Sequence, residues 1–235
     1  MQFKDFSNII LSLLFLSIPV FANDSVLIVE SDKNLEDKNV EAEKGNSLYE
    51  LCHLESLLER AVFEKAIQGY DKIKSKKNLL VIVDFSKPSV EKRFFVINID
   101  KKEVVYKTLV AHGRNSGDNY ATKFSNIPGS LQSSLGFYLT GSIIQSPKHG
   151  LALELIGLEK GINDKAKERE IIIHAADYVS ESFCKMQGRL GRSFGCPALP
   201  PDLNKEIVQQ IKNGAVLYIH GNDNNYLLSS LFLKD

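Results

Sequence analysis

The sequence of 235 residues has no excess of either charge, because 29 acidic residues balance its 29 basic ones. Broad electrostatic binding to nucleic acid normally requires a basic excess, so this balance argues against a nucleic-acid partner. A hydrophobic fraction of 43% with 25% charged residues is ordinary for a globular protein. The sequence also contains no internal repeat and no low-complexity tract. Disorder, collagen-like repeats and a multi-span membrane protein are therefore excluded as descriptions of the whole chain.

The sequence also has no apolar run long enough to cross a bilayer comfortably. The run Ile9–Val20 falls short of the roughly 20 residues that a membrane helix needs. It follows Lys4, and Val20 and Ala22 place small residues before a cleavage point, which is typical of a secretory signal peptide. We expect residues 1–22 to be removed and the protein to reach the periplasm or cell envelope across the inner membrane. The alternative is an uncleaved N-terminal anchor.

Close pairs of metal-binding residues are missing too. A zinc site built from His174, Cys184 and Cys196 is conceivable, but the sequence has no Cys-x-x-Cys or His-x-x-x-His pair of the kind that zinc sites use. We therefore expect no metal and no cofactor.

What the sequence does contain is a polar leader, a helix and then a series of short strands. Residues 23–77 form the leader and the helix, because apolar residues recur at three- and four-residue steps from Leu48 to Ile73. Asn46 or Ser47 is expected to cap this helix. Residues 78–235 are expected to form one mainly β domain with flanking helices, either a β-sandwich or a barrel. The expected strands are Leu79–Phe85, Phe94–Ile99, Val104–Ala111, Phe137–Thr140, Leu151–Ile156, Glu170–His174 and Ala215–His220, with a helix after Pro201 that continues through Ile211.

Reactive side chains are densest between Ile171 and Pro201. An apolar strand ends at His174, and a loop rich in glycine and arginine leads to Cys196. A cysteine nucleophile needs a neighbouring base, which His174 can supply. Backbone N–H groups near Gly195 could face a developing oxyanion. Taken alone, a single cysteine and a single histidine are more often packing residues, so these residues only suggest a catalytic site.

The same loop carries candidate substrate-binding residues. Arg189 and Arg192 could clamp a substrate carboxylate, although loop arginines are usually just solvated. Ser193 of this loop is a further candidate for substrate binding. His112 could line the substrate-binding cleft or be a structural residue. His149, in a Lys-His-Gly turn, is expected to be an ordinary loop residue.

Residues 188–198, which read GRLGRSFGCPA, resemble the catalytic motif of the murein L,D-transpeptidase family. The segments HAA at 174–176, HGRNSG at 112–117 and GLEKGIN at 157–163 are similar to that family as well, so the likeness extends over about residues 79–220. The resemblance implies a mainly β catalytic domain with Cys196 as nucleophile and His174 as general base. It further implies that the backbone carbonyl of Ala175 orients the histidine ring.

The resemblance also implies a reaction. The donor would be a peptidoglycan stem tetrapeptide, whose terminal D-amino acid leaves as a thioester forms on Cys196. An acceptor amine, on a second stem or on an envelope protein, would then resolve the thioester. The alternatives are a murein L,D-carboxypeptidase or cysteine peptidase with the same dyad, and a non-catalytic wall-binding protein.

Three positions depart from the pattern of many relatives. Ala175 stands where they have glycine, Phe194 where they have histidine, and Ala198 where they have arginine. The loss of that arginine leads us to expect that Arg189 or Arg192 binds the substrate carboxylate.

The cysteine count gives one further expectation. Three cysteines in an exported protein leave one thiol unpaired. If Cys196 is the nucleophile, Cys52 and Cys184 are the only possible disulfide pair; both could equally be buried thiols.

Overall fold

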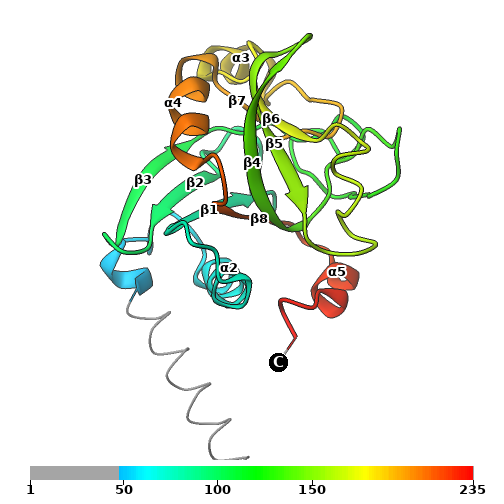
Figure 1. Cartoon of the computed structure of the whole chain (residues 1–235). Helices are drawn as coiled ribbons and strands as arrows, with labels where there is room; N and C mark the ends of the chain where they lie inside the picture. Colours follow the sequence, from blue (N-terminus) through cyan, green and yellow to red (C-terminus); the bar gives the residue numbers. More distant parts are fainter. Residues whose placement is uncertain (1–47, 235) are drawn as a thin grey trace, which may run out of the picture. The chain divides into compact units, whose positions relative to one another are not determined.

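The computed structural model describes residues 48–234, so the expected signal peptide, the leader and the expected helix cap at Asn46 or Ser47 lie outside the described residues. The described residues form a single eight-stranded sheet with helices around it (Figure 1). This confirms the expected mainly β fold with flanking helices. The strands are β1 Leu79–Asp84, β2 Phe94–Asn98, β3 Glu103–Thr108, β4 Gly136–Ser146, β5 Gly150–Gly157, β6 Ile172–Ala175, β7 Ala198–Leu199 and β8 Val216–His220.

The sheet has the order β3-β2-β1-β8-β4-β5-β6-β7. Most neighbours are antiparallel, but β1 pairs in parallel with β8, and β6 pairs in parallel with β7. The sheet nearly closes on itself, because the segment after β3 turns to the opposite edge. There Ala111 bridges Ala198 of β7, and Gly113 bridges Ser193. This closure brings residues 109–113 against the loop that precedes β7, which is the loop that contains Cys196.

Four helices accompany the sheet, and residues 48–51 are helical as well. The helix expected from Leu48 to Ile73 is interrupted by turns at residues 52–59, where His53 has a left-handed φ of 52°. The apolar face continues through these turns, because Leu54 and Leu58, which belong to them, are buried. The helices are α2 Arg60–Ile73, α3 Glu181–Gln187, α4 Pro201–Ile211 and α5 Asn224–Ser229.

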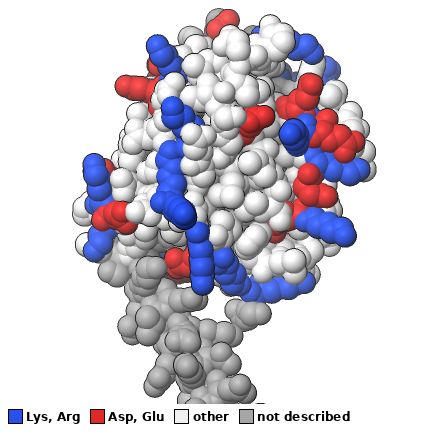
Figure 2. All heavy atoms as spheres, viewed as in Figure 1, with Lys and Arg blue, Asp and Glu red and all other residues white. Residues whose placement is uncertain are grey.

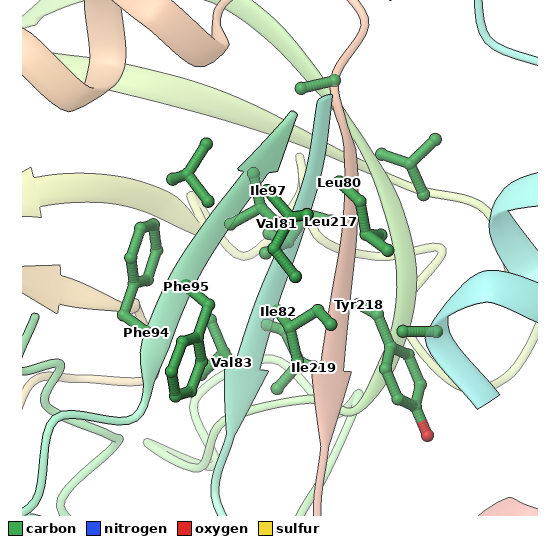
Figure 3. Packing of buried hydrophobic residues seen from close by; sticks show 14 of the residues in the cluster. Leu80, Val81, Ile82, Val83, Phe94, Phe95, Ile97, Leu217, Tyr218 and Ile219 are labelled. Carbon is green, nitrogen blue, oxygen red and sulfur yellow. The ribbon is translucent and has the colours of Figure 1, made fainter. Parts of the chain in front are cut away.

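The hydrophobic core lies between the sheet and these helices. β1, β2 and β8 are almost completely buried, which explains why their sequences are continuous apolar runs rather than alternating ones (Figure 3). Helix α2 packs against β1 and β8, while α4 contacts β4, β5 and β6. Gly69 allows the close approach of α2, because a Cβ at this position would lie 2.1 Å from the ring of Phe137.

The surface agrees with the balanced composition. Basic and acidic side chains are interspersed over the face shown in Figure 2, without a large field of one sign. Among the described residues, no helix has the length and apolar character required to cross a membrane.

Candidate active site

Strand β6 places His174 between two neighbouring strands. His174 lies opposite Ala152 of β5 and opposite Ala198 of β7, and it is only 1% exposed. Its Nδ1 atom lies 2.8 Å from the backbone carbonyl oxygen of Ala175. A carbonyl oxygen can only accept a hydrogen bond, so Nδ1 carries the ring proton. The Nε2 atom therefore keeps the lone pair that a general base needs.

The surroundings of His174 favour its neutral form. Burial lowers the pKa of His174 to about 4; the Ala175 carbonyl opposes this shift, and the charge of His149 adds to it. The ring is consequently neutral at pH 7, and it can accept a proton at Nε2.

Cys196 reaches the same part of the sheet through the parallel pair of β6 and β7. Because His174 lies opposite Ala198, Cys196 comes beside Ile172, two residues earlier on both segments. The Sγ atom lies 3.5 Å from the N–H nitrogen of Ile172 and 3.5 Å from the carbonyl oxygen of Glu170. Within residues 48–234, no hydrogen bond joins Cys196 to His174. Such pairs are often loose in unliganded active sites and close when substrate binds.

The thiol is held by a turn with an unusual backbone. Glu170, a non-glycine residue, has a left-handed φ of 53°, and its carbonyl oxygen accepts from the thiol. Burial raises the pKa of the Cys196 thiol, whereas the N–H of Ile172 and the guanidinium of Arg169 lower it. A left-handed backbone at a non-glycine residue costs free energy and is often found at functional sites.

Arg169 is a residue of this site that sequence reasoning missed. Its guanidinium donates to the carbonyl oxygens of Ser125 and Gln132, both at 2.6 Å, and also to the hydroxyls of Ser130 and Ser134. A Cβ on Gly195 would lie 3.3 Å from Nη2 of Arg169, so the guanidinium lies directly behind the residue that precedes Cys196. In the sequence, Arg169 stands in the charged segment 165–170, which gives no sign of these contacts.

The backbone next to Cys196 bears on two expectations. Ser193 is only 5% exposed; its hydroxyl donates to the carbonyl of Cys196 and accepts from the N–H of Gly195. The hydroxyl of Ser193 therefore shapes the loop, and its expected role in substrate binding stays a prediction. The N–H of Gly195 is already engaged, so it is not available to an oxyanion. The N–H of Cys196, which no other described residue engages, is the remaining donor at this point.

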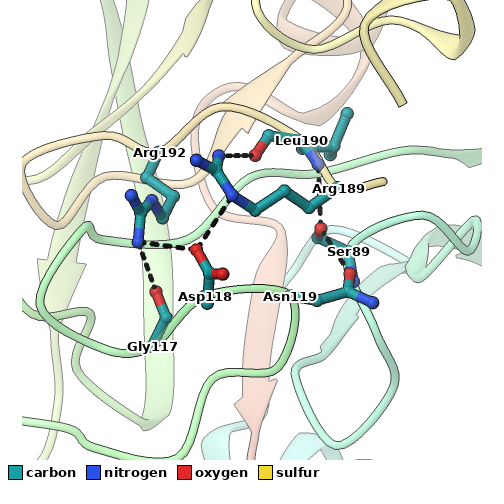
Figure 4. Close-up of polar contacts among 7 residues, drawn as sticks. All are labelled: Ser89, Gly117, Asp118, Asn119, Arg189, Leu190 and Arg192. Carbon is teal, nitrogen blue, oxygen red and sulfur yellow. Dashed lines mark hydrogen bonds and ion pairs between the residues drawn. The ribbon is translucent and has the colours of Figure 1, made fainter. Parts of the chain in front are cut away.

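Arg189 and Arg192 do not form the expected free carboxylate clamp. Both bind the same oxygen of Asp118, from Nε of Arg189 at 2.8 Å and from Nη1 of Arg192 at 3.0 Å (Figure 4). Arg192 also donates to the carbonyl of Gly117 at 3.1 Å. The two arginines thus attach the loop before Cys196 to the loop after Gly113. Their carboxylate partner is supplied by the protein itself.

His112 is structural. It is fully buried, and its Nδ1 lies 2.7 Å from Nη2 of Arg93, which is also fully buried. Burial, and then the nearby Arg93, lower the pKa of His112 to about 4. Of the two alternatives for His112, its burial favours the structural one, because no part of its side chain is open to solvent.

The cysteines are all free thiols in the structure. The possible pair of Cys52 and Cys184 is not formed. Cys52 is part of the main hydrophobic cluster, whereas Cys184 packs against a separate cluster that includes Leu190 and Ala198. In the part of the chain that the structure describes, no cluster of metal-binding side chains occurs either.

Comparison with known proteins identifies the family. The sequence model of the L,D-transpeptidase catalytic domain family matches residues 54–220, which is most of the chain. The chain belongs to this family. No curated protein matches it.

Solved structures of L,D-transpeptidases are similar to this chain at low identity. An L,D-transpeptidase from Mycobacterium smegmatis is 16% identical, with a TM-score of 0.39 over 61% of this chain and 59% of the other. The helical cell shape determining protein Pgp2 (K307A mutant) from Campylobacter jejuni is also 16% identical, with a TM-score of 0.42 over 72% and 60% of the two chains. This chain thus spans about three fifths of the length of these structures. Membership in the family rests on the sequence model and not on these scores.

Proposed function

We propose that the protein is an L,D-transpeptidase that acts on peptidoglycan stem peptides through a thioester on Cys196. One observation carries the proposal. In a chain of this family, Ala175 fixes the proton of His174 on Nδ1, and the β6–β7 pair places Cys196 beside the strand that holds this base.

In the first half of the reaction, Nε2 of His174 takes the proton of the Cys196 thiol. Sγ then forms a bond to the carbonyl carbon of the third residue of a stem tetrapeptide. The amide bond between this carbonyl carbon and the terminal D-amino acid breaks, and the imidazolium returns its proton to the leaving amine. The negative charge that develops on the carbonyl oxygen is stabilised by the N–H of Cys196.

In the second half, an acceptor amine attacks the thioester carbonyl. The C–S bond breaks, a new amide bond forms, and the proton of the amine returns to the thiolate through His174. With the amine of a second stem as acceptor, the product is a cross-linked dimer. Water, a free D-amino acid or a lysine of an envelope protein would react at the same thioester and give different products.

The test is to incubate the purified protein with a disaccharide-tetrapeptide and to measure product masses. The proposal predicts a dimer that lacks one D-amino acid. A tripeptide without any dimer would contradict transfer and favour a carboxypeptidase. An unchanged substrate would contradict both reactions and favour a non-catalytic wall-binding protein.

Two cysteine variants form a matched pair of controls for this experiment. Cys196→Ala removes the proposed nucleophile and is expected to abolish all products. Cys184→Ala removes another partly buried free thiol and is expected to retain activity. Equal activity in both variants would contradict the assignment of Cys196.

We also propose that the protein acts in the cell envelope after export. The support is the pattern of residues 1–22, with Lys4, the apolar run Ile9–Val20 and the small residue Ala22. The intact mass of the protein recovered from the envelope fraction tests this. A chain that begins at Asn23 agrees with export and cleavage, whereas a chain that begins at Met1 contradicts cleavage.

A further inference from the structure

The hairpin of β4 and β5 brings an additional histidine to the base. The two strands end at the pair Ser146 and Gly150, so residues 147–149 form the turn. In the next pair of strands, Ala152 of β5 lies opposite His174 of β6. His149 is only three residues from Ala152, and the left-handed φ of 66° at Gly150 allows the chain to turn between them. The strand register therefore places the turn beside the end of β6 that holds His174.

The two imidazole rings are stacked. Their centroids lie 3.8 Å apart and their planes meet at 28°. His174 is 1% exposed, whereas His149 is exposed to solvent. His149 thus covers a face of the His174 ring, while the Ala175 carbonyl holds its Nδ1 edge.

We propose that His149 is a positioning residue for the base of the reaction. Its ring fixes the plane of the His174 ring and keeps water from its face, so that Nε2 stays directed toward the substrate side. The inference rests on the proposed function insofar as His174 is the base. The contact between the two rings can be tested without any turnover.

The stack also affects the charge of the base. Two groups beside the imidazole influence its protonation: the Ala175 carbonyl on its own strand, which favours the charged form, and His149 on the hairpin turn, which disfavours it. A protonated His149 would lie face to face with an imidazolium at His174, and like charges at that distance repel. His149 therefore helps to keep His174 neutral.

The test uses two substitutions of His149 and follows His174 by NMR. His149→Ala removes the imidazole ring with its charge, and it exposes the face of the His174 ring that His149 covers. We expect the titration of His174 to move to higher pH by about one unit, since both the charge and part of the burial are lost. His149→Phe keeps an aromatic cover without a charge, so we expect a smaller upward shift and a preserved ring-current shift of the His174 protons.

Kinetics provide a second readout. If wild-type protein releases the D-amino acid, the acid limb of its pH–rate profile is expected to shift upward in His149→Ala, and His149→Phe is expected to recover most of the rate lost in His149→Ala. Absence of turnover in wild type would contradict the proposed function, but the titration of His174 would still test the stack.

His53→Asn is the matched control, because it removes another exposed histidine at a left-handed position that asparagine tolerates. It is expected to leave the His174 titration unchanged. The inference would be overturned if His149→Ala left both the ring-proton shifts and the titration of His174 as they are in wild type.

Discussion

The histidines His112 and His174 are buried to a similar extent, but the Nδ1 atom of His112 accepts a hydrogen bond whereas that of His174 donates one. Both are at most 1% exposed, and burial lowers the pKa of each to about 4. The Nδ1 atom of His112 faces the Arg93 guanidinium, which can only donate, so the proton of this ring is on Nε2. The Nδ1 atom of His174 faces the Ala175 carbonyl, which can only accept, so its proton is on Nδ1.

The difference shows that the partner at Nδ1, and not burial, decides which histidine can act as a base. His174 keeps a lone pair on Nε2, whereas the lone pair of His112 is used by Arg93. The Nε2 atom of His112 is buried and makes no hydrogen bond of normal geometry in the described part of the chain, but the backbone of Gly117 and Asp118 interacts with this ring and opposes the lowering of its pKa. His112 thus accepts one of the hydrogen bonds that stabilise the buried guanidinium of Arg93, which also donates to the carbonyls of Val110 and Lys87.

The largest expected effect separates the two histidines by activity. His174→Ala should lower the rate of D-amino acid release by about 10²- to 10⁴-fold, the usual contribution of a general base. Its urea unfolding curve should show that the protein is still folded. Release from His174→Ala at the wild-type rate would remove the basis of the comparison.

The next effect separates them by stability. His112→Ala should lower the free energy of unfolding by about 2–4 kcal/mol, because it leaves a cavity and removes an acceptor from the buried Arg93. Urea denaturation measures this loss, with His53→Asn as the variant expected to stay close to wild type. If His112→Ala were as stable as His53→Asn, the hydrogen bond from Arg93 to His112 would make no contribution to the free energy of unfolding.

A third prediction concerns pH. The pKa of His112 is lower in the folded protein, at about 4, than its ordinary value of 6.5. Between these values the unfolded chain binds more protons, so this residue makes stability rise with pH and fall on acidification from 6.5 to 4. The full difference corresponds to about 3 kcal/mol.

The measurement compares the free energy of unfolding of wild type and His112→Asn across this range. Glu159 titrates in the opposite sense, because burial raises its pKa, but its contribution cancels in the comparison. The wild-type advantage should shrink as the pH falls. An advantage that is constant from pH 6.5 to 4 would contradict the assigned titration of His112.

The strands β1, β2 and β8 could be predicted from the sequence, because long apolar runs signal strands that are buried on both faces. Other bounds differ: the strand expected at 137–140 extends over Gly136–Ser146, and the strand expected at 170–174 begins at Ile172, because Glu170 has a left-handed φ of 53°. Helix α4 was predicted to end at Ile211, as observed, because Asn213-Gly214 follow; its start differs by one residue, because Pro201 is itself the first residue of the helix. β7 was missed because two residues carry no pattern. α3 was missed because none of its residues is buried, and a helix without a buried face leaves no apolar period.

The site could be predicted less completely. The motif indicated Cys196 and His174, but the partners of the loop come from distant segments. Asp118 is far from Arg189 and Arg192 in the sequence, so their ion pairs are invisible without the fold. His149 likewise reaches His174 only through the register of β5 and β6.

The smallest expected effect concerns the thiol of Cys196, which has no hydrogen bond to His174 in the described residues. Arg169→Gln should slow alkylation of Cys196 by iodoacetamide several-fold near pH 8, because a cation that favours the thiolate is lost. Arg169→Lys keeps the charge and should recover most of the rate, while Arg192→Gln serves as a control in the neighbouring loop. Equal rates in Arg169→Gln and wild type would mean that Arg169 only holds the backbone.

The most direct test of the account is an NMR measurement of the ¹⁵N shifts of both histidine rings at neutral pH, which report the protonated nitrogen of each. We predict the proton on Nδ1 in His174 and on Nε2 in His112. A proton on Nε2 of His174 would contradict the account, because Nε2 would then have no lone pair with which to accept the proton of Cys196.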